Sequence, residues 1–132
     1  MASLINNSSR ETIEEKRSRI MMMINNVTSE RDRLQRQVDE YKAMNVSINS
    51  AISELTSARS GIAAISAQVS RNYKSKKASA KAKEISGKQS EVSSIIGTLQ
   101  QALGESNKKI SELNVHINNM EAQLNSLYRQ ML

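Results

Sequence analysis

The densest group of chemically active side chains is a basic stretch in the middle of the chain. Six positive charges precede its first acid, Glu84, and they are Arg71, Lys74, Lys76, Lys77, Lys81 and Lys83. Lysines in such numbers can contact phosphate groups, but single-strand or sequence-specific nucleic-acid binding normally adds stacking aromatics or a readout motif. The stretch offers only Tyr73, and no apolar face of the kind that a membrane-surface helix needs. We interpret it chiefly as a solvated basic tip, with an acidic protein partner, nucleic acid and a membrane surface as alternatives.

Residues that could catalyse a reaction or bind a metal are sparse. The chain has one histidine, His116, and no cysteine, whereas a metal site needs several nitrogen, sulfur or carboxylate ligands. No base neighbours a plausible nucleophile, and no glycine loop of the phosphate-binding kind is present. The sequence therefore predicts a protein that is not an enzyme, with no cofactor, no metal and no small-molecule substrate.

The composition indicates an all-α protein. The 132 residues include no Pro, Trp or Phe, and hydrophobic residues make up 38%. Strands depend on aromatic residues and on Gly and Pro turns, while an elongated helical rod needs fewer apolar positions than a round core. Outside the basic stretch 13 Lys and Arg balance 13 Asp and Glu, so the net charge of +6 originates there. The apolar cluster at residues 20–24 is too short for a secretory signal, and no apolar run approaches a membrane span.

Apolar residues recur at intervals of seven along two arms of similar length, about 13–70 and 80–131. Such a repeat is typical of a coiled-coil seam. The predicted hairpin seam consists of Ile13, Ile20, Val27, Leu34, Tyr41, Ile48, Leu55, Ile62, Val69, Ile85, Val92, Leu99, Leu113, Met120 and Leu127. We predict a long antiparallel helical hairpin, coiled-coil-like and rod-shaped; the alternative is one continuous helix.

The expected domain organisation is a flexible N-terminus at residues 1–9 and a single hairpin domain at 10–132. The first arm should span about 10–72 and the second about 78–131, with the turn somewhere in 70–88. Pairing Leu55 with Leu99 closes the hairpin about residue 77. Two local signals are Ser8-Ser9-Arg10-Glu11, which fits a capping box, and Ser86-Gly87, which is a possible late turn.

A second set of positions, four residues after the first, offers further apolar side chains. We predict that a partner contacts this set together with one methionine: Met23, Ile24, Val38, Ile52, Ile96, Leu103, Ile110, Ile117 and Leu124. Polar residues interrupt the set at Arg17, Arg31, Asn45 and Arg59. Either these four meet another protein chain, or the arginine stems lie along the seam and their charged ends reach water. More apolar residues flank both arms, among them Met21, Met22, Met44, Ile95 and Val115, so we expect a hetero-oligomer.

Two features of the chain resemble a known family, and together they cover about residues 10–132. One is the pair of arms of similar length, and the other is the apolar pattern of the first arm, IEEKRSRIMMMINNVTSERDRLQRQVDEYKAMNVSINSAISEL. They are similar to the small WXG-type helical proteins of bacterial type VII secretion, in particular the longer partners of LXG-domain toxins. That family often has a Trp-x-Gly turn; Tyr73 stands at the aromatic place here and Ser75 at the glycine. Leu132 follows Tyr128 where the export motif of the family has an acidic residue.

The resemblance implies a non-enzymatic, chaperone-like adapter. Such a protein binds the helical N-terminal domain of an LXG toxin, sometimes with a second small helical protein, and presents it to the export machine. It implies a bacterial cytoplasmic location and leaves open whether the adapter is exported with its partner without a cleaved signal peptide. The alternatives from the residues alone are a self-assembling coiled coil of a phage or surface filament, and a binder of acidic partners or nucleic acid through the basic tip.

Overall fold

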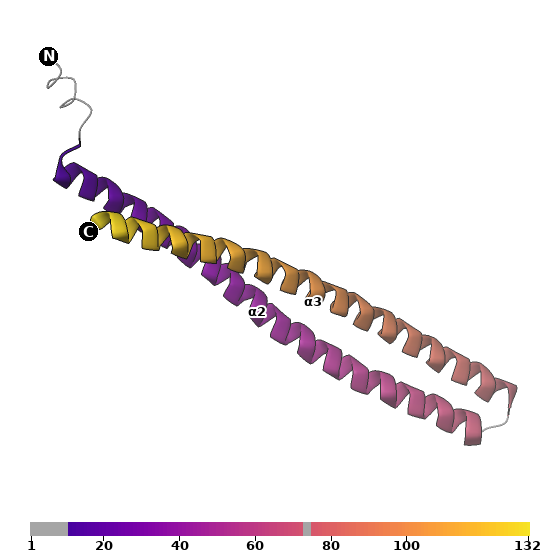
Figure 1. Cartoon of the computed structure of the whole chain (residues 1–132). Coiled ribbons are helices and arrows are strands. Elements are labelled where there is room, and N and C mark those ends of the chain that lie inside the picture. Colours follow the sequence, from indigo (N-terminus) through magenta and orange to yellow (C-terminus); the bar gives the residue numbers. More distant parts are fainter. Residues whose placement is uncertain (1–10, 73–74) are drawn as a thin grey trace, which may run out of the picture. The chain divides into compact units, whose positions relative to one another are not determined.

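The computed structural model describes residues 11–72 and 75–132, and it confirms the all-α helical hairpin. Two long helices account for nearly all of these residues: α2 (Ile13–Asn72, 60 residues) and α3 (Lys76–Met131, 56 residues). They lie beside each other with opposite chain directions (Figure 1). The alternative of one continuous helix is therefore excluded, because α2 ends at Asn72 and α3 starts anew at Lys76.

Each helix starts at a residue that caps it. The Thr12 Oγ1 accepts a hydrogen bond from the Glu15 amide at 3.0 Å, and a Glu15 carboxylate oxygen accepts one from the Thr12 amide at 3.4 Å. This is a capping box, placed four residues later than the one expected from Ser8, which lies outside the described residues. At α3 the Ser75 Oγ accepts a hydrogen bond from the Ala78 amide at 3.1 Å, so Ser75 is the N-cap.

The fold-back point follows from the hydrogen bonds that join the two helices. Asn45 bonds Asn107, 62 residues away, and Arg59 bonds Ser93, 34 residues away. Both pairs are centred on residue 76, one residue from the expected centre. The late turn considered at Ser86-Gly87 is wrong, since both residues lie inside α3.

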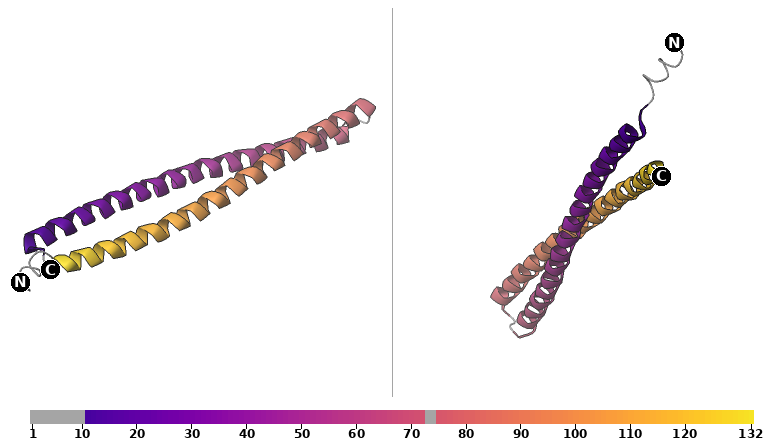
Figure 2. Two further views of the ribbon diagram at one scale, coloured as in Figure 1. Left: turned by 90° about the horizontal axis from the view of Figure 1, so that it is seen from above. Right: turned by 90° about the vertical axis from the view of Figure 1, so that its left-hand side faces the viewer.

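The chain forms two compact units, each made of segments of both helices. The sequence colours in Figure 2 show that α2 and α3 run in opposite directions. The terminal unit comprises residues 11–39 and 110–132 of the described chain, and the central unit comprises the described part of 40–109. No helix within 11–72 or 75–132 has the length and hydropathy needed to cross a membrane.

Candidate partner-binding surface

The terminal unit has a closed apolar core. Ile20, Ile24, Leu124 and Leu127 form a buried cluster, against which Val27 and Met131 pack. Leu34, Val38, Leu113 and Ile117 are buried as well, and Ile20 and Val38 are completely inaccessible to solvent. At about 25 cal/mol per Å² of apolar surface, burial of this many large side chains accounts for much of the stability of a two-helix unit.

The central unit has a half-open seam instead. Its buried apolar residues are Ala78, Ala82 and Ile96, only one of which is large. The other large apolar seam residues are only half-buried, namely Tyr41, Ile48, Ile52, Leu55, Ile62, Val69, Ile85, Val92, Leu99 and Leu103. A seam of two helices leaves such side chains partly in water, and a further helix would cover them.

Among the described residues, three hydrogen bonds join a side chain of α2 to a side chain of α3 in the central unit, and all three lie on one side of its seam. The Asn45 amide donates to the Asn107 Oδ1 at 2.9 Å, the Arg59 Nη1 donates to the Ser93 Oγ at 3.4 Å, and the hydroxyls of Ser66 and Ser86 are 3.0 Å apart. In heptad notation each joins an a position of α2 to an e position of α3. Since a and e are neighbours on a helix surface, the e positions of both helices line this polar side.

The g positions, each directly before an a position, must then line the opposite side of the central seam. Lys81, Lys88 and Lys109 hold the outer g positions of α3, and between them and along α2 up to Ile65 the g residues are apolar: Met44, Ala51, Ala58 and Ile65 on α2 with Ile95 and Ala102 on α3. We call these six residues the apolar flank. Its large members, Met44, Ile65 and Ile95, are 43%, 53% and 50% exposed, although each would favour burial. The apolar flank and the half-buried seam beside it are the candidate partner-binding surface.

The structure changes the assignment of the residues predicted to contact a partner. Ile24, Val38, Ile96, Ile117 and Leu124 are buried, and the other members at the same heptad position, Ile52, Leu103 and Ile110, are half-buried. These residues belong to the seam of the hairpin itself, because two antiparallel helices pack through both their a and their d positions. Only Met23 of that set is exposed.

The structure buries or half-buries every member of the predicted seam except Ile13. Ile20, Leu34, Leu113 and Leu127 are buried and the others, including Val27 and Met120, are half-buried. Ile13 is 80% exposed. It is the first residue of α2, and Met131 at the end of α3 already packs on the Ile20 and Ile24 cluster, so no turn of α3 lies opposite Ile13.

Three of the four polar seam positions make contacts inside the hairpin. Asn45 and Arg59 bond α3 as described, and Arg31 lies half-buried with an ion pair to Asp32 at 3.2 Å. Asn45 and Arg59 therefore have hydrogen-bond partners within the hairpin itself. The Asn45 Oδ1 and the Ser106 Oγ are buried without a hydrogen-bond partner, which makes this polar layer costly.

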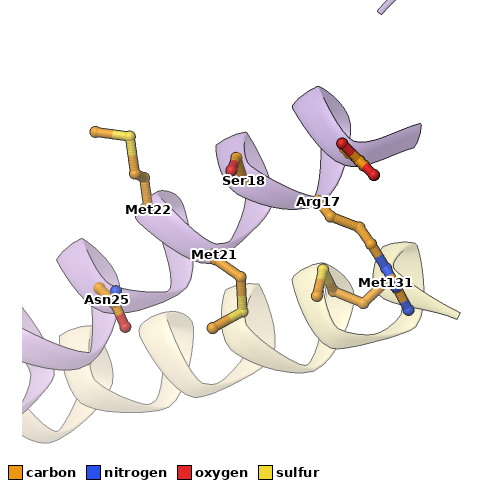
Figure 3. Close-up of a pocket in the computed structure, with 7 residues that line it drawn as sticks. Arg17, Ser18, Met21, Met22, Asn25 and Met131 are labelled. Atoms are coloured by element: carbon orange, nitrogen blue, oxygen red, sulfur yellow. The ribbon is translucent and has the colours of Figure 1, made fainter. Parts of the chain in front are cut away.

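Arg17, the fourth polar position, is exposed and lines a shallow hollow of the terminal unit. Met21 and Met131 line the same hollow, and Figure 3 shows Met22 pointing away from α3. The hollow is wide and open to solvent. Its methionine side chains suit irregular apolar contacts, but it is not as long as the apolar flank.

The predicted basic tip lies at the end of α2 and in the first turns of α3. Arg71, Lys76, Lys77, Lys81 and Lys83 are exposed, whereas Tyr73 and Lys74 lie outside the described residues. Lys81 pairs with Glu84 at 3.0 Å. His116 is exposed, and residues 11–72 and 75–132 contain no cluster of His, Asp or Glu able to hold a metal ion.

Comparison with known proteins gave no relative. The chain matches no protein-family model, no curated protein and no solved structure.

Proposed function

We propose that this protein is a non-enzymatic adapter that binds the helical N-terminal domain of an LXG-type toxin and presents it to a type VII secretion system. The sequence resemblance supplies the kind of partner. The observation that carries the proposal is the half-open seam of the central unit together with its exposed apolar flank. A two-helix protein with such a surface gains stability when further helices cover it.

The terminal and central units suit different tasks in this proposal. The closed core of the terminal unit holds the hairpin together without help. The central unit leaves its large aliphatic side chains half-exposed, so the free energy of covering them is available for binding. Methionine at the edge of the flank adapts to the shape of a partner.

Co-expression with the helical domain of an LXG toxin from the same genome should give a complex that survives size-exclusion chromatography. We expect the complex to contain at least one adapter chain for each toxin domain, because the helices of the toxin domain would cover the half-open seam and the apolar flank of the adapter. The measurement is the mass of the eluted complex by light scattering, and the matched control is the C-terminal toxic domain, which should elute separately. Deletion of the adapter gene should abolish export of the toxin.

Three outcomes contradict the proposal. The first is separate elution of adapter and LXG domain. The second is a large self-assembled species of the adapter alone, which would favour a structural filament. The third is a salt-dependent shift of DNA by the adapter, lost when the exposed lysines of the basic tip are neutralised, together with no toxin complex.

A further inference from the structure

The acidic residues of the central unit are all placed at the same heptad position. They are Glu40 and Glu54 on α2 and Glu84, Glu91 and Glu105 on α3. Each follows an a residue by two positions, which makes it a c position. On a helix surface c lies next to g, one step farther from the seam. The glutamates therefore border the apolar flank on both of its outer sides.

Ion pairs within the described chain cancel the charge of two of these five glutamates and leave three uncancelled. Lys81 pairs with Glu84 at 3.0 Å and Lys88 with Glu91 at 3.6 Å. Both of these lysines occupy g positions of α3, as does Lys109. Glu40, Glu54 and Glu105 form no ion pair with Lys109 or with any other residue that the structure describes. In the terminal unit, by contrast, Glu30 accepts hydrogen bonds from Arg33, and this contact lowers the pKa of the Glu30 carboxyl.

We infer that the apolar flank of the central unit docks one amphipathic helix of a partner protein whose apolar stripe is bordered by Lys and Arg. Because the flank runs from Met44 to Ile65, such a helix would have about six turns and a length of about 33 Å. Apolar contact supplies the affinity, and the uncancelled glutamates select the charge of the partner and its orientation. This inference rests on the proposed adapter function and names the chemistry of its partner.

A second copy of this chain is a poor occupant of the same surface. Two apolar flanks packed face to face would bring their glutamate borders together, and like charges in an interface oppose association. The basic tip of another copy has the right charge, but its side chains between the lysines are Ser and Ala, which give no apolar stripe.

The test uses two synthetic helical peptides of about 28 residues as probes, long enough to form stable helices. Both carry Leu at a and d; one has Lys and Arg at e and g, and the other has Glu there. Fluorescence anisotropy of labelled peptide is measured while the full-length protein is titrated. We expect the basic-bordered peptide to bind at least about tenfold more tightly than the acidic one, and to weaken with added salt.

Variants of the protein identify the surface. The double change Ile65→Glu and Ile95→Glu should abolish binding of the basic-bordered peptide, and the double change Glu54→Lys and Glu105→Lys should reverse the preference between peptides. The controls are Val46→Glu, which alters a 67% exposed apolar residue on the opposite side of α2, and Asp39→Lys, an exposed charge reversal. Both controls should bind like the unchanged protein. Circular dichroism shows whether each variant keeps its helix content.

Equal binding of the two peptides, or equal loss in the Val46→Glu control, overturns the inference. A concentration-dependent dimer that Ile65→Glu and Ile95→Glu abolish overturns it as well, because the occupant is then a second copy. If the peptide results hold but no LXG domain binds, the docking surface stands and the proposed toxin partner fails. If the LXG domain binds while the peptides do not, the adapter function stands and this surface fails.

Discussion

Replacing Ile20 with alanine is expected to lower the free energy of unfolding by about 2–5 kcal/mol. Ile20 is completely buried in the cluster that it forms with Ile24, Leu124 and Leu127, so removal of its outer carbons leaves a cavity between the two helices. Since a chain of this size has a total stability of only about 5–15 kcal/mol, the loss is a large share of the whole. Urea unfolding followed by circular dichroism measures it.

The matched control is Ile13→Ala. Ile13 stands one heptad before Ile20 at the same heptad position, but it is 80% exposed, so its replacement should change the free energy of unfolding by less than about 0.5 kcal/mol. Equal losses for the two variants would mean that α3 extends its packing to the first turn of α2. No loss for Ile20→Ala would mean that the terminal unit has no closed core.

Replacing Asn45 with leucine is expected to raise the free energy of unfolding by about 1–3 kcal/mol. The Asn45 Oδ1 is buried without a hydrogen-bond partner, and leucine would place an apolar group at this a position of the seam. The Asn107 Oδ1 would lose the hydrogen bond that Asn45 donates. Because Asn107 is exposed, this oxygen can accept a hydrogen bond from water instead. The register of the helices should not change, because the short connection between Asn72 and Lys76 fixes it.

The control for Asn45→Leu is Asn49→Leu, four residues farther along α2 at an exposed position. Its effect on the free energy of unfolding should stay within about 0.5 kcal/mol. A destabilised Asn45→Leu protein would show that the bond between Asn45 and Asn107 is worth more than the burial of an unpaired oxygen costs. The polar layer would then raise the free energy of unfolding of the central unit and not lower it.

The helices and their seam could be predicted from the sequence because one physical rule governs them. Apolar residues at intervals of seven place Ile20, Leu34 and Leu113 on the inner side of each helix, and the structure buries them. Helix ends were harder to place. The caps are Thr12 and Ser75, and Ser and Thr are common along this chain, so several other positions offered similar signals.

The candidate binding surface could not be read from the heptad pattern in the same way. The pattern does not say how much of each seam residue the other helix of the hairpin covers. It therefore predicts that Ile24 and Ile96 contact a partner protein, whereas the hairpin itself buries them. Separating the g side from the e side required the crossing hydrogen bonds of Asn45, Arg59 and Ser66. The placement of the glutamates at c positions, seven or fourteen residues apart, is visible in the sequence, but its relation to a surface follows only from the position of the apolar flank.

The most direct test of the whole account is a distance between α2 and α3 within one molecule. The chain has no cysteine, so spin labels can be attached at Asn26→Cys and Asn125→Cys, two exposed positions of the terminal unit. The labelled protein is then diluted with an excess of unlabelled protein. The antiparallel hairpin predicts a distance below about 30 Å in double electron–electron resonance, since packed helix axes lie about 8–10 Å apart. A short distance that disappears on dilution, or a separation near the ~150 Å of one continuous helix, would contradict the hairpin and the binding surface built on it.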